Sequence, residues 1–62
     1  MKRHIETYRG VKLYHDEANV YPYSGRGILW SSKSMETLKR YIDNTIDSGN
    51  KAPNKQGELV RV

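Results

Sequence analysis

The clearest hydrophobic pattern in this chain lies over residues 34–48. Apolar side chains recur there every three or four positions, so they would form one stripe along an α-helix. The residues of this stripe are Met35, Leu38, Ile42 and Ile46. Ser32 or Ser34 can cap the helix start by accepting a hydrogen bond from a free backbone amide, and Gly49 suits the left-handed residue past its end.

Shorter patterns before the helix are typical of β-strands. Residues 4–15 alternate in character and predict one half-buried strand, in which Gly10 marks a bulge, a bend or a close backbone approach. Residues 16–19 have the composition of a turn. After this turn, residues 19–23 and 28–30 predict two further short strands.

The composition changes after the helix. Residues 48–57 are polar and rich in linker residues, whereas residues 58–62 are β-prone and could return as an edge strand or remain a frayed tail; we favour the strand. We therefore predict an α+β fold in which an antiparallel meander of about three strands packs on one amphipathic helix. Residues 1–49 would form this single small domain, and residues 50–62 a flexible polar tail with a possible terminal strand.

Size limits the core. At 62 residues the chain is one domain at most, and such a domain buries only about 60% of the surface that its unfolded chain exposes. There is no cysteine and hence no disulfide framework to add stability. A homo-oligomer or a tightly bound partner would supply extra burial.

The charge balance is basic. Eleven Lys and Arg residues against seven Asp and Glu residues give a net charge of +4, which favours an anionic partner such as DNA or RNA. No apolar run approaches the ~18 residues of a membrane span, and the chain starts without the apolar stretch of a signal peptide. We therefore expect a soluble, cytoplasmic protein with no membrane partner.

No set of residues has the pattern of an active site. Residues 15–17, His-Asp-Glu, are the one local cluster of metal or acid–base groups, but successive strand residues point to different sides. No serine has the Gly-x-Ser-x-Gly context of a nucleophile, and residues 24–27 lack the lysine and the strand-to-helix junction of a phosphate-binding loop. We predict a protein that is not an enzyme and has no cofactor or metal.

The aromatic residues are more informative. Five tyrosines, one tryptophan and no phenylalanine are present, and tyrosine and tryptophan tolerate the half-exposed positions that binding surfaces use. Alternation along the first strand places Tyr8, Lys12 and Tyr14 on the sheet face away from the helix. A second reading is that the tyrosines simply fill the core and rim of a thin domain. The candidate nucleic-acid contacts are Arg9, Lys12, Arg26, Tyr8, Tyr14, Tyr21 and Tyr23.

The segment 8–43 resembles the three-stranded-sheet-plus-helix DNA-binding domains of plant ethylene-response factors and of some phage and transposon integrase arms. The residues that carry the resemblance are Tyr8-Arg9-Gly10-Val11, Met35-Glu36-Thr37 and Arg40-Tyr41-Ile42-Asp43. In those families the sheet enters the major groove, which implies Arg9, Lys12 and Arg26 as contacts here. The tryptophan-centred middle strand of those domains is absent, and Tyr21-Pro22-Tyr23 stands in its place.

The short length, tyrosine-rich hairpin and polar tail also resemble small accessory proteins of bacteriophages, which include nucleic-acid binders and inhibitors of host proteins; a phage-encoded chain would act in the host cytoplasm. Two hypotheses follow. The first is a nucleic-acid-binding module with a basic, tyrosine-rich hairpin face. The alternative is an accessory or inhibitor protein that binds a host protein through the same face or an edge strand, with a homodimer as one form. Salt separates the two hypotheses, because phosphate contacts weaken steeply with salt.

Overall fold

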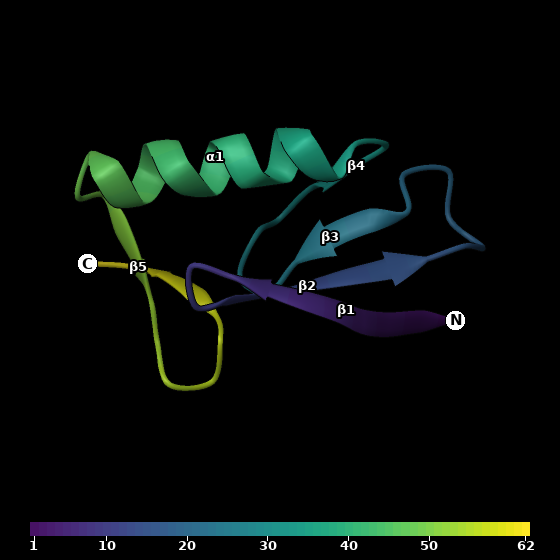
Figure 1. Cartoon of the computed structure of the whole chain (residues 1–62), viewed down its shortest axis with the longest axis horizontal. Coiled ribbons are helices and arrows are strands. Elements are labelled where there is room, and N and C mark those ends of the chain that lie inside the picture. Colours follow the sequence, from purple (N-terminus) through teal and green to yellow (C-terminus); the bar gives the residue numbers. More distant parts are fainter.

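The structure, a computed structural model, describes residues 1–62 as one helix and six strands (Figure 1). Strands β1 to β4 form an antiparallel meander in that order, and β5 pairs with β6 in a separate hairpin. The α+β class and the single helix are confirmed, although the sheet has four strands rather than about three. The elements are β1 (Lys2–Tyr8), β2 (Val11–Asp16), β3 (Tyr23–Gly25), β4 (Ser31–Ser32), α1 (Met35–Asp47), β5 (Lys51–Pro53) and β6 (Leu59–Arg61).

Residues 4–15 do not form the single strand that their alternation predicts. Arg9 and Gly10 both have positive φ, at 49° and 85°, and this is the conformation of a tight two-residue hairpin turn whose twist matches the flanking strands. Tyr8 consequently pairs with Val11 across the turn. Gly10 does mark a bend and a close approach, because a Cβ atom there would lie 2.9 Å from Cγ of Pro53.

A bulge interrupts the β1–β2 ladder at Ile5. His4 pairs with Tyr14 and Glu6 pairs with Leu13, so Ile5 has no partner on β2. The alternation of the sequence groups Ile5 with Val11 and Leu13, but Ile5 is exposed, whereas the other two are fully buried. The extra residue therefore changes which β1 side chains face the core.

The next two strands lie later in the chain than predicted. Asp16 and Asn19 use their side-chain oxygens to accept from the amides of Ala18 and Tyr21, and these local bonds hold an irregular turn until β3 begins at Tyr23. Residues 28–30, predicted as a strand, form a loop before β4. This loop inserts Ile28 into the core.

The core is a cluster of six buried side chains between α1 and the strands, namely Val11, Leu13, Ile28, Leu38, Ile42 and Leu59. Helix α1 contributes Leu38 and Ile42, as its stripe predicts. Ser34 is the N-cap residue, but its hydroxyl makes no capping bond; Ser32 Oγ instead accepts from the Ser34 amide. The helix is neither long nor apolar enough to cross a membrane.

The C-terminal segment is not a free tail in the structure. Residues 51–53 and 59–61 pair as the β5–β6 hairpin, so the terminal strand is present, although its partner is β5. The Lys12 amide donates to the Gly57 carbonyl at 2.8 Å, and the Leu59 amide donates to the Arg26 carbonyl at 2.9 Å. These bonds and the buried Leu59 side chain join the hairpin to the main sheet.

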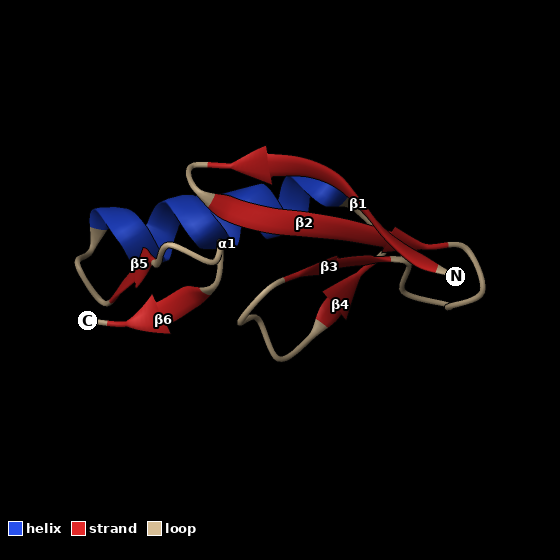
Figure 2. Cartoon of the chain, turned by 90° about the horizontal axis from the view of Figure 1, so that it is seen from below, coloured by secondary structure: helices blue, strands red, loops and turns tan.

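Helix α1 covers one face of the four-stranded sheet. Figure 1 shows the helix above the sheet, and Figure 2, drawn from below, shows the sheet in front of the helix. The face seen in Figure 2 has no helix over it. We call it the open sheet face.

Two glycines test how the C-terminal hairpin is joined to the sheet. Gly27 and Gly49 have similar positive φ, at 84° and 79°, but a Cβ atom would collide with the Leu59 backbone at Gly27 and would meet open space at Gly49. Gly49→Ala should therefore cost only about 1–2 kcal/mol of backbone strain. Gly27→Ala should lower the free energy of unfolding by clearly more, as measured by urea denaturation. Equal losses would contradict the close packing of Leu59 on Gly27.

Candidate nucleic-acid interface

The structure does not bring the candidate contact residues together on one face. Val11 and Leu13 are buried on the helix side of β2, so alternation places Lys12 and Tyr14 on the open sheet face, as predicted. Tyr8 was predicted to share that face. It instead pairs with Val11 and packs against the core, because the chain reverses at residues 9–10 between Tyr8 and Lys12.

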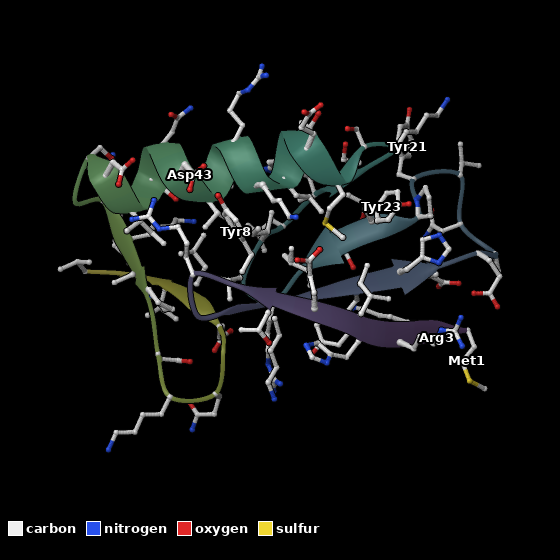
Figure 3. All side chains as sticks on the ribbon, viewed as in Figure 1. Met1, Arg3, Tyr8, Tyr21, Tyr23 and Asp43 are labelled. Carbon is white, nitrogen blue, oxygen red and sulfur yellow. The ribbon has the colours of Figure 1, made fainter.

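Tyr8 and Arg9 bind carboxylates of α1. The Tyr8 hydroxyl lies 3.0 and 2.9 Å from the two oxygens of Asp43, toward which it points in Figure 3. Arg9 Nη1 donates to Asp43 at 2.9 Å and Nη2 donates to Asp47 at 3.1 Å. The Arg9 guanidinium, and secondarily the Tyr8 hydroxyl, hold the pKa of Asp43 below its ordinary value. These contacts tie the hairpin turn to the helix, so Arg9 is not a free cation.

The charged groups of α1 pair with the sheet and its turn and not with one another. Asp43 pairs with Arg9, and Lys39 pairs with Glu6 of β1 at 3.3 Å. The bulge of the hairpin lies at Ile5 and not at Gly10, so Arg9 does not share the face of Lys12.

The other two tyrosines also lie apart from each other. Tyr23 begins β3 on the core side, where its ring centroid is 5.0 Å from that of His15. Tyr21 belongs to the loop before β3 and is 52% exposed. Lys33 Nζ lies 5.5 Å from the centroid of the Tyr21 ring, in a cation–π arrangement. Because β3 begins only at Tyr23, the two tyrosines do not share a strand face.

The open sheet face carries residues that the sequence did not single out. Lys2 pairs with Asp16, and its Nζ lies 5.2 Å from the centroid of the Tyr14 ring. His4 pairs with Tyr14 and makes an edge-to-face contact with it at 5.7 Å. A two-residue turn recognised at residues 9–10 would have folded β1 onto β2, but without the bulge at Ile5 that register would have placed His4 opposite His15 instead of Tyr14.

Arg26 lies at the border of this face. It follows β3 directly, and its amide donates to the Lys12 carbonyl at 2.9 Å, so the two residues are neighbours across the ladder. The side chain of Arg26 is exposed, whereas the stem of Lys12 is half-buried beside Gly57. The two residues add positive charge at the same end of the open face.

The carboxylates are distributed unevenly between the two faces. Only two of the eleven basic side chains, Arg9 and Lys39, form salt bridges. Arg9, in the hairpin turn, binds carboxylates of α1, and Lys39 of α1 binds a carboxylate of β1. Asp16 and Glu17 bind the terminal amine of Met1. The cations of the open face are therefore left without a carboxylate partner; they are Lys2, Lys12 and Arg26.

No group of three or more His, Asp or Glu side chains comes together in a way that could hold a metal ion. Residues 15–17, the cluster noted in the sequence, are separated by their contacts: the His15 ring packs edge-to-face on Tyr23, whereas Asp16 and Glu17 bind the Met1 amine. Comparisons with protein-family models, curated proteins and solved structures found no match to this chain.

Acidification tests the contacts of Asp43. Its pKa in the folded protein lies below the ordinary value of 3.8, so its contacts stabilise the fold above that value, and the contribution is lost as the pH falls through the folded pKa. Asp43→Asn should start less stable at neutral pH. Its urea midpoint should then fall less steeply than that of the wild type between about pH 5 and pH 2.

Glu36 provides a control on the same helix, because its carboxylate forms no salt bridge. Glu36→Gln should keep the pH dependence of the wild type. A wild-type slope in Asp43→Asn would show that the Tyr8 and Arg9 contacts do not contribute to stability.

Proposed function

We propose that this protein is a small non-enzymatic module that binds nucleic acid through its open sheet face. The observation that carries the proposal is the group of cations around Tyr14, on the face that α1 leaves uncovered. Lys2, Lys12 and Arg26 have no carboxylate partner, so they can meet phosphates without first breaking an ion pair. Contacts of this kind supply most of the affinity in non-specific nucleic-acid binding.

The aromatic groups of the same face support the proposal. Tyr14 and His4 are held against each other, and Lys2 lies over the Tyr14 ring. Single-stranded nucleic acids bind surfaces in which aromatic rings receive bases and nearby cations follow the backbone. In the sheet-plus-helix DNA-binding domains that residues 8–43 resemble, the sheet is likewise the contact surface.

The proposed contact set differs from the one expected from the sequence. Lys12, Tyr14 and Arg26 remain, and Lys2 and His4 join them. Tyr21 lies in the exposed loop before β3 and is outside this set. Tyr8, Arg9 and Tyr23 are placed on the helix side and are assigned to stability, since their side chains bind α1 carboxylates or pack against the core.

Protein binding is the second candidate function. Leu29 is 99% exposed and Val20 is 72% exposed, although both are large apolar side chains. β1 is also an edge strand, so its outer backbone groups could pair with a strand of a partner or of a second copy. An accessory factor or inhibitor would use these features, and its binding would respond little to salt.

A double variant tests the leading proposal. Lys12→Gln with Arg26→Gln should bind a fluorescein-labelled duplex or single strand at least ~tenfold more weakly at low salt, as measured by fluorescence anisotropy. The plot of log affinity against log salt should become shallower by about two units if each side chain meets one phosphate. Because neither side chain is in a salt bridge, the circular dichroism melting curve should stay close to that of the wild type.

The matched control is Arg40→Gln with Lys51→Gln, which makes the same change in net charge. Arg40 is exposed on α1, and Lys51 Nζ donates to the Tyr41 hydroxyl on the helix side. This control should keep most of the affinity. Equal weakening by both double variants would show that only total charge matters, and absence of binding by the wild type at low salt would favour the protein-binding candidate.

A further inference from the structure

The structure has one pocket, with a volume of about 170 Å³, at the end of the sheet where β1 begins. Its walls come from segments that are distant in the sequence: the outer ends of β1 and β2, the loop between β2 and β3, and the chain from β3 to β4. We call it the terminal pocket. Among its lining residues are Lys2, Asn19, Tyr21, Ser24, Trp30 and Ser31.

Two exposed aromatic side chains border this pocket and are held in place by other contacts. Trp30 packs edge-to-face on Tyr41 of α1, with ring centroids 5.0 Å apart. Tyr21 lies under the ammonium group of Lys33. Its loop is fixed by the Asn19 side chain, which accepts from the Tyr21 amide at 3.2 Å. The walls are therefore formed before any ligand arrives, which lowers the entropic cost of binding.

The pocket also has polar groups that the protein does not use. The Lys2 amine and the hydroxyls of Ser24 and Ser31 make no hydrogen bond to another group of the chain. Ligand pockets for drug-sized molecules usually enclose about 300–1,000 Å³, so this one suits a single small planar group. Aromatic walls with free donors and acceptors match the faces and edges of a nucleobase.

The position of Lys2 connects the terminal pocket to the open sheet face. Lys2 lines the pocket and also lies over the Tyr14 ring. A strand whose phosphates meet Lys12 and Arg26 at one end of the face can therefore continue past Tyr14 toward the pocket. The bases of a duplex are paired and stacked, so only an unpaired base could enter.

We propose that the terminal pocket holds one unpaired nucleobase, and that the protein consequently prefers single-stranded over duplex nucleic acid. The proposal rests on the proposed nucleic-acid-binding function and adds the class of nucleic acid. Tyr21 is the stacking residue, and Ser24 and Ser31 meet the polar edge of the base. Lys33 beside Tyr21, and Lys2 at the border with the open sheet face, meet the adjoining phosphates.

The experiment compares one labelled oligonucleotide as a single strand and as a duplex of the same length, by anisotropy at low salt. The wild type should bind the single strand more tightly, and the emission of Trp30, the sole tryptophan, should change on binding the single strand. Tyr21→Ala should weaken single-strand binding at least about fivefold and leave duplex binding unchanged. Tyr21→Phe, which keeps the ring, should retain the preference.

Val20→Ala is the matched control, because Val20 precedes Tyr21 in the same exposed loop but does not line the pocket. It should bind both forms as the wild type does. Equal wild-type affinities for single strand and duplex, or equal effects of Tyr21→Ala and Val20→Ala, would overturn the pocket proposal while leaving the proposed function in place. If the wild type binds neither form, both proposals fail.

Discussion

A single helix can cover only one face of a sheet, and this chain has only one helix. The helix places Leu38 and Ile42 against Val11 and Leu13, and those four side chains with Ile28 and Leu59 make up the whole buried apolar cluster. This arrangement decides which strand residues face solvent. The strand residues that alternate with the core positions must lie on a face that water reaches, so that face can carry charges and half-exposed rings at little cost.

The ion pairs of the basic side chains lie on the helix-covered side of the sheet and not on its open face. The carboxylates of α1 bind the turn and edge of the β1–β2 hairpin, where Arg9 and Lys39 form ion pairs between sheet and helix. Such exposed pairs contribute modestly to stability, but they engage Asp43 and Asp47 of α1 and Glu6 of β1 on the helix side. On the open face, Lys2, Lys12 and Arg26 keep charges that no carboxylate neutralises, and Lys2 lies over the Tyr14 ring. This separation supports the proposed function better than net charge alone, which many soluble domains share.

The helix and the α+β class could be predicted because the spacing of apolar residues along the chain indicates which side chains are buried. Which side chains of the β1–β2 hairpin lie on each face could not be predicted. Arg9 adopts a positive φ that few non-glycine residues take, and the extra residue at Ile5 changes the alternation again. The order in the C-terminal segment depends on backbone bonds to Lys12 and Arg26, which leave no pattern in a polar sequence. The terminal pocket depends on contacts between segments that are distant in the sequence, so no local sequence motif predicts it.

Binding through the open sheet face is tested most directly by an NMR titration of the ¹⁵N-labelled protein with a short single-stranded oligonucleotide at low salt. Binding through the open sheet face should give the largest shifts of backbone amides in β1, β2 and the turn at Arg26, on the face opposite α1. The exposed side of the helix, represented by Arg40 and Asn44, should change little. Shifts concentrated on α1, or no shifts at any site, would contradict the assignment of the open sheet face as the binding surface.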